Sequence, residues 1–137
     1  MGRACPSIRC HADAVSNDRI EALLTQLRAF VRERDWEQFH DPKNLVMLLA
    51  SEVGELVAEY RWVEGASADE HSSEPASRAR IESEVADVTI ALLLLVDRIG
   101  LDLDEIVRRK IGANAERYPA DAVRGSAARP ASTAPRT

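Results

Sequence analysis

Four carboxylates in two matched pairs are the residues of this 137-residue sequence best suited to chemistry. Glu52 and Glu55 lie in "SEVGEL", and Glu84 and Asp87 lie in "SEVADV". On a helix this spacing of three places both side chains of a pair on one face. Aliphatic residues flank all four, and burying an ionised carboxylate among them is costly unless a partner compensates it. The alternative is that each pair belongs to an exposed polar stripe.

If the two pairs face each other, four like charges meet, and either their pKa values rise or cations bind. Oxygen ligands without His or Cys favour hard cations, so Mg²⁺ is the predicted metal, with Mn²⁺ as the second choice. A di-iron bundle would instead use Glu-x-x-His pairs. Glu59 and Glu82 are expected to be ordinary surface residues.

The carboxylate pairs need helices to hold them, and the sequence predicts an all-α, four-helix-bundle-like fold. Aromatic residues make up only 4% of the chain, so the core must be mainly aliphatic. Apolar residues recur at intervals of three and four, and no alternating strand pattern is found. The expected helices cover residues 18–34, 42–63, 77–99 and 102–116.

Local signals set the expected helix ends. Asp18 and Asp102 are predicted N-caps, Asp41 precedes a proline suited to the first helical position, and Gly100 is a stop. In the helix at 77–99, a seam is predicted at Ile81, Val85, Val88, Leu92, Leu95 and Ile99. Further aliphatic residues lie off this seam, at Ile90, Leu93 and Leu94. This surplus predicts a homo-oligomer.

The expected organisation is a flexible leader at 1–16, one domain at 17–119 and a disordered tail at 120–137, with the polar stretch 64–77 as a mobile loop. The leader has no secretory h-region, and the longest apolar run, 90–96, is too short to span a bilayer. A cytoplasmic protein without membrane attachment is therefore expected. Cys5, Cys10 and His11 do not have the four-ligand spacing of a structural zinc site.

The net charge of −5 argues against binding a nucleic acid polymer, because no basic surface is evident to contact phosphates. An acidic protein can still act on free nucleotides when a metal ion bridges the two sets of negative charge.

Three segments together resemble the MazG-type all-α nucleoside triphosphate pyrophosphohydrolases, and most closely their small, single-domain, dCTP-pyrophosphatase-like branch. They are "ERDWEQFHDPKNLVMLLASEVGELVAEYRW", "ESEVADVTIALLLLV" and "KIGANAERYP". The resemblance covers most of residues 17–119. It implies an enzyme that converts a (d)NTP, dCTP or a related or modified deoxynucleotide, to the monophosphate and pyrophosphate. It also implies a homo-oligomer, a tetramer rather than a dimer, whose sites are completed by a neighbouring subunit.

The resemblance also implies roles for individual residues. Glu52, Glu55, Glu84 and Asp87 would be the catalytic metal ligands. The expected substrate-binding residues are Trp36, His40, Asn44, Trp62, Lys110, Asn114, Arg117 and Tyr118. For each, a structural role remains the alternative: the tryptophans as core residues, His40 and Asn44 as loop and helix-surface residues, Lys110 and Arg117 as complements to a helix dipole, and Tyr118 as core.

Two positions depart from the dCTP-preferring relatives. Leu27 stands where a histidine is expected and Ala91 where a tyrosine is expected, which predicts a roomier, less polar base pocket. Two other functions remain open: a non-catalytic helical bundle serving as a binding or assembly module, and a phosphoribosyl-ATP-type pyrophosphohydrolase.

Overall fold

A computed structural model describes the backbone of residues 7–126 and the side chains of residues 19–126. Every regular element in that range is helical, which confirms the all-α prediction. The elements are α1 (Ser7–Glu33), η1 (Glu37–Phe39), α2 (Pro42–Tyr60), η2 (Gly65–Ser67), α3 (Ala68–Ser73), α4 (Pro75–Arg98), α5 (Leu103–Arg117) and α6 (Ala120–Val123). The chain divides into two compact units between Gly100 and Leu101.

Three of the predicted helix ends are confirmed. Asp41 caps α2 by accepting a hydrogen bond from the Asn44 amide at 3.0 Å, with Pro42 in the first turn. Asp102 caps α5 in the same way, accepting from the Glu105 amide at 3.0 Å. Gly100 follows α4 with φ of 67°, a left-handed conformation that glycine adopts without strain.

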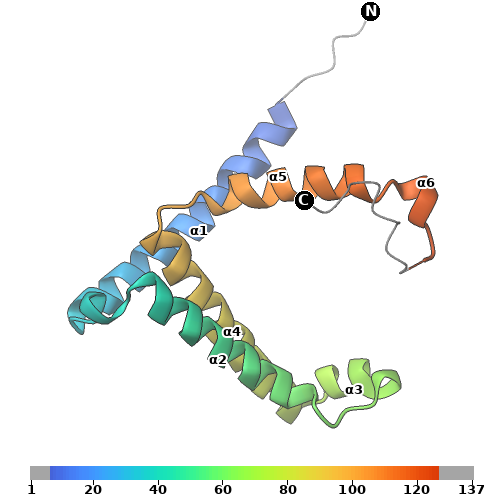
Figure 1. Cartoon of the computed structure of the whole chain (residues 1–137), viewed down its shortest axis with the longest axis horizontal. Helices are drawn as coiled ribbons and strands as arrows, with labels where there is room; N and C mark the ends of the chain where they lie inside the picture. Colours follow the sequence, from blue (N-terminus) through green and yellow to red (C-terminus); the bar gives the residue numbers. More distant parts are fainter. Residues whose placement is uncertain (1–6, 127–137) are drawn as a thin grey trace, which may run out of the picture. The chain divides into compact units, whose positions relative to one another are not determined.

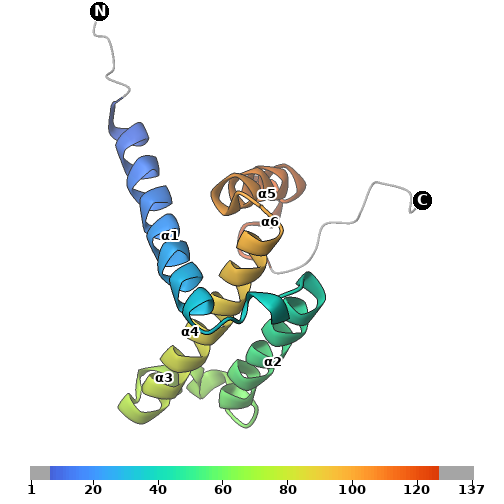
Figure 2. The same cartoon turned by 90° about the vertical axis from the view of Figure 1, so that its left-hand side faces the viewer.

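In the first unit, α2 and α4 form the main helix pair and lie side by side in antiparallel directions (Figure 1). The later turns of α1 and the short α3 also contact α4 (Figure 2). α4 is therefore the central element, and it contributes half of the buried apolar residues found between residues 19 and 126. These are Leu24, Val31, Leu45, Ala91, Leu93 and Val96.

The predicted face of α4 is wrong in part. Val85, Leu92 and Ile99 of the expected seam are 47%, 38% and 45% exposed, whereas Leu93, expected off the seam, is 4% exposed. The physical reason is that α4 packs against both α1 and α2, so its buried surface does not follow a single two-helix seam.

Other predicted boundaries also need correction. α1 begins at Ser7 rather than Asp18, because no glycine or proline between residues 7 and 33 interrupts it. The stretch 64–77 contains η2 and α3, and it is tied down by a 2.8 Å hydrogen bond between the hydroxyls of Tyr60 and Ser72. α4 begins at Pro75 because Glu74 is its cap and accepts from the Ser77 amide at 2.7 Å.

The two ends of the chain are only partly covered. Residues 7–16 of the expected leader are helical, and Ala120–Val123 of the expected tail form α6. Residues 1–6 and 127–137 lie outside the described residues, as do the side chains of Cys5, Cys10 and His11. No helix in the described part of the chain is both long and apolar enough to cross a membrane.

Candidate functional site

Three of the four predicted metal ligands converge between α2 and α4. One carboxylate oxygen each from Glu52, Glu55 and Glu84 lies within 4.8 Å of the other two. Glu52 and Glu84 are half-buried and Glu55 is exposed. Oε2 of Glu84 is buried and has no hydrogen-bond partner within the described structure. A cation placed among these oxygens would compensate both the orphaned atom and the like charges.

The electrostatics of the cluster follow from this crowding. Burial raises the pKa of Glu52, and the charges of Glu55 and Asp87 raise it further. Burial also raises the pKa of Glu84, helped by Glu55, Asp87, Glu52 and Glu59. Asp87 therefore lies close enough to act on both glutamates, although its oxygens are outside the group within 4.8 Å.

Glu59 is not the ordinary surface residue that was expected. Its side chain is only 20% exposed, its charge acts on Glu84, and its Oε2 accepts a 3.0 Å hydrogen bond from Nε of Arg80. Glu82, by contrast, matches its prediction: it is 63% exposed and pairs with Arg78 one turn away on α4.

An apolar pocket of about 250 Å³ adjoins the carboxylates. Glu52 and Asp87 form part of its wall, so one end of the pocket is acidic. The other lining residues are Leu27, Phe30, Val31, Trp36, His40, Leu48, Ile90, Ala91 and Leu94. Leu27 and Ala91, the two departures from the dCTP-preferring pattern, are both on this wall, and Ala91 is 1% exposed.

A tight turn after α1 brings Trp36 to the pocket. Asp35 adopts a left-handed φ of 53°, which aspartate tolerates better than most residues. The Trp36 amide donates to the Val31 carbonyl at 3.1 Å, and the indole lies edge-on to Phe30 with ring centroids 5.8 Å apart. Trp36 is 43% exposed, so part of its ring remains available to a ligand.

Two other predicted binding residues of the first unit are placed elsewhere. Asn44 donates from Nδ2 to the Phe39 carbonyl at 3.1 Å, so its amide closes the turn before α2. Trp62 is 90% exposed and lines a separate cleft with His71 and Glu74, not the pocket of Trp36.

The remaining predicted binding residues belong to the second unit. Lys110, Asn114 and Arg117 lie along α5 at the expected helical spacing, and all three are exposed. The amide of Tyr118 donates to the Asn114 carbonyl at 2.8 Å, and the Arg117 guanidinium lies 5.6 Å from the centre of the Tyr118 ring. Tyr118 is half-buried.

Comparison with known proteins gives the family. Residues 48–128, which include both carboxylate pairs and α5, match the MazG-like family. The chain belongs to this family. Both carboxylate pairs of this MazG-like chain lie within the matched residues. The pocket is lined partly by matched residues and partly by residues of α1 and the following turn, which precede the match.

The MazG-like chain is also similar to individual proteins. It is 43% identical over 98 residues to dCTP pyrophosphatase 1 of Rattus norvegicus, covering 72% of this chain and 58% of that protein. It is 41% identical over 97 residues to dCTP pyrophosphatase 1 of Homo sapiens, covering 71% of this chain and 57% of that protein. A crystal structure of a pyrophosphatase from Archaeoglobus fulgidus superposes with a TM-score of 0.68 at 37% identity, covering 74% of this chain and 93% of that one. The chain thus spans less than two thirds of the length of these curated relatives.

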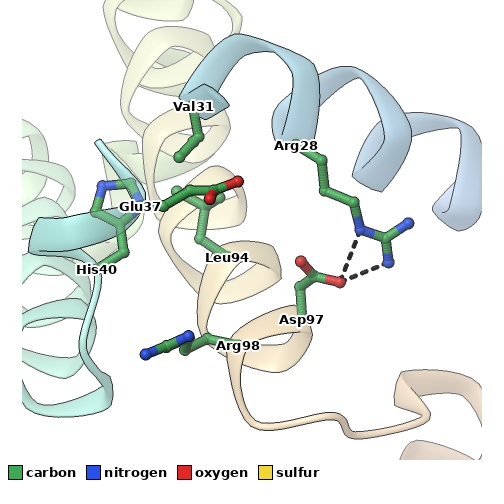
Figure 3. A pocket seen from close by; sticks show the side chains of 7 residues that line it. All are labelled: Arg28, Val31, Glu37, His40, Leu94, Asp97 and Arg98. Carbon is green, nitrogen blue, oxygen red and sulfur yellow. Dashed lines mark hydrogen bonds and ion pairs between the residues drawn. The ribbon is translucent and has the colours of Figure 1, made fainter. Parts of the chain in front are cut away.

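Sequence reasoning missed a second cavity of the MazG-like chain, of about 290 Å³, beside the first (Figure 3). The two cavities share Val31, His40 and Leu94. Arg28 and Asp97 lie on the wall of the second one and are joined by hydrogen bonds. No spacing rule links residues so far apart in the chain, although Asp97 on an aliphatic stretch of α4 was a signal that a partner was needed.

Proposed function

We propose that this chain is a metal-dependent nucleoside triphosphate pyrophosphohydrolase. Its substrate would be dCTP or a related or modified deoxynucleotide, which water cleaves to the monophosphate and pyrophosphate. The observation that carries the proposal is the junction of three converging carboxylates with an apolar, aromatic-lined pocket. A triphosphate suits the first part once cations are bound, and a base suits the second.

The residues fit a hard divalent cation. Glu52, Glu55 and Glu84 supply oxygen ligands, the orphaned Oε2 of Glu84 needs a partner, and the raised pKa values of Glu52 and Glu84 reflect burial and uncompensated charge. Asp87 would complete the set from the pocket wall. Bound Mg²⁺, or Mn²⁺, would neutralise triphosphate charge and lower the pKa of the attacking water.

The predicted binding residues are the proposed substrate contacts. Trp36 would stack on the base, while Leu27 and Ala91 keep the lining of the pocket apolar. Lys110, Asn114 and Arg117 would bind phosphate oxygens, because a helical face of cations and amides suits them. Tyr118 and Trp62, with His40 and Asn44, remain proposed substrate contacts.

A homo-oligomer is part of this proposal. Among the described residues, many large apolar side chains are exposed, including Met47 at 62%, Val57 at 57% and Ile111 at 62%. Surfaces of this kind are typical of subunit interfaces. We propose a tetramer, located in the cytoplasm, that removes unwanted deoxynucleotides; an unchanged dNTP pool in a deletion strain would contradict that role.

The decisive experiment measures pyrophosphate release from canonical and modified NTPs and dNTPs, with and without Mg²⁺. We expect magnesium-dependent turnover that Glu55→Gln lowers by at least about 100-fold, because a ligand oxygen is lost. Glu82→Gln is the matched control, since Glu82 lies on α4 and pairs only with Arg78 among the described residues. Turnover of phosphoribosyl-ATP alone would favour that enzyme class, and no turnover on any nucleotide would favour a binding module.

A further inference from the structure

Among the described side chains, one polar link joins α1 to α4 beside the apolar pocket. Arg28 of α1 donates to Oδ1 of Asp97 on α4 from Nε at 3.0 Å and from Nη2 at 2.5 Å (Figure 3). Nη1 of Arg28 also donates to Glu21 at 2.7 Å, within α1. Among the described side chains, no other hydrogen bond or ion pair connects these two helices.

The same two helices both contribute walls to the pocket. α1 contributes Leu27, Phe30 and Val31, and α4 contributes Ile90, Ala91 and Leu94. Arg28 directly follows Leu27 in the chain, and Asp97 lies one turn beyond Leu94. A shift of α1 along or away from α4 would therefore change the width of the pocket between these walls.

Only some of the described apolar side chains of α1 are buried. Of its described apolar residues, Leu24 and Val31 are buried, whereas Leu23 and Phe30 are 49% and 44% exposed. The Arg28 and Asp97 side chains are 39% and 30% exposed, so the link is shielded from water only in part. A guanidinium held at two nitrogens by one carboxylate has a more defined direction than a simple charge contact.

We propose that Arg28 and Asp97 are a positioning pair that sets the width of the apolar pocket and with it the affinity for the base end of the nucleotide. The inference rests on the proposed function. Neither residue belongs to the carboxylate cluster, so the pair should act on substrate binding and leave the chemical step and metal binding unchanged. Because Trp36 follows the end of α1 through a tight turn, it would move with that helix.

The test is a double-mutant cycle on the full-length chain with Arg28→Gln, Asp97→Asn and the double variant, using the best nucleotide of the panel. Each single variant should raise KM roughly three- to tenfold with kcat and the Mg²⁺ concentration for half-maximal rate unchanged. The KM of the double variant should be no higher than that of either single variant, since all three lose the same contact. Arg28→Lys keeps the positive charge but has one donor nitrogen in place of two, so it should have a KM between those of Arg28→Gln and the wild type.

Arg78→Gln is the matched control, because it removes an equally polar ion pair within α4 that does not reach α1. It should leave KM unchanged. Amide hydrogen exchange over residues 24–31 gives a second readout, and Asp97→Asn should accelerate it whereas Arg78→Gln should not.

Outcomes separate the two proposals. Turnover by the wild-type chain together with unchanged KM in Asp97→Asn would overturn the positioning role while leaving the proposed function intact. A fall in kcat at constant KM would also overturn it, since the pair would then act on chemistry. No turnover by the wild-type chain on any nucleotide would refute the proposed function and this inference with it.

Discussion

Glu52→Gln should make the metal-free chain more stable than the wild type, and should make it less stable than the wild type when Mg²⁺ is present. Without a divalent cation, Glu52 and Glu55 repel each other across no more than 4.8 Å. Even at the dielectric constant of water, that separation corresponds to about 0.9 kcal/mol. Removing the charge should therefore raise the melting temperature of the metal-free chain by about 3–5 °C.

With Mg²⁺ the order should reverse. A ligand that binds only the folded state stabilises it by about 2.7 kcal/mol at a hundredfold excess over its Kd. The neutral amide introduced by Glu52→Gln would be a weaker ligand than the carboxylate, so the variant should gain much less than the wild-type chain. The wild-type chain should then melt at the higher temperature.

The pH dependence of the metal-free chain provides a further check. Burial and the charges of Glu55 and Asp87 raise the pKa of Glu52 in the folded state. At this group the folded state therefore binds more protons than the unfolded state, so the contribution of Glu52 to stability is largest below its unfolded pKa of about 4.3 and is lost as pH rises through its folded pKa. The advantage of Glu52→Gln should accordingly be absent at low pH and appear on the way to neutrality.

Thermal unfolding followed by circular dichroism, in EDTA and in excess Mg²⁺, is the assay. Glu82→Gln serves as the control, because Glu82 is exposed and paired with Arg78, and its small effect should not depend on metal. The reasoning would be refuted if Glu52→Gln destabilised the chain in EDTA, or if Mg²⁺ stabilised the variant as much as the wild type.

Three further predictions concern the pocket and the elements around it. Ala91→Tyr should fill part of the pocket, so KM should rise more for purine than for pyrimidine nucleotides in the pyrophosphate assay; equal rises would argue that the base lies elsewhere. Asp35→Ala should cost about 1 kcal/mol in urea unfolding, because alanine lacks the short polar side chain that helps aspartate or asparagine to adopt the left-handed φ of 53°, whereas Asp35→Asn should cost less. Glu74→Ala should lower the melting temperature at pH 7, with the loss shrinking as pH falls through the folded pKa of Glu74, which hydrogen bonds from the Ser77 and Ala76 amides lower. A loss independent of pH would show that the cap does not act through its charge.

The sequence predicted best what depends on neighbours in the chain. Asp41 and Asp102 accept hydrogen bonds from amides three residues ahead, and Gly100 supplies a left-handed conformation, so each signal is complete within one turn. The predicted start of α1 was wrong. Asp18 has the side chain of a cap, but such a residue marks a helix end only where the preceding residues cannot continue the helix.

The convergence of three carboxylates could be predicted because it depends only on which two helices pack together. Each pair is fixed on one helical face by its spacing, so placing α2 against α4 brings Glu52, Glu55 and Glu84 together. The pocket could not be derived in this way from the residues. It depends on the direction in which the chain leaves α1 at Asp35 and on how α1 sits against α4, and neither is encoded by a periodic pattern.

The two halves of the candidate site differ in character, and that contrast is the reason for proposing a nucleoside triphosphate as the substrate. At one end, crowded carboxylates have raised pKa values and an orphaned oxygen, which makes the folded chain a ready ligand for hard cations and, through them, for phosphates. At the other end, Ala91 and Leu27 leave an apolar space beside Trp36. A ligand that matches both ends must be highly charged at one end and flat and apolar at the other. A nucleoside triphosphate has this form, whereas a protein partner would leave the carboxylate cluster uncompensated unless it brought cations of its own.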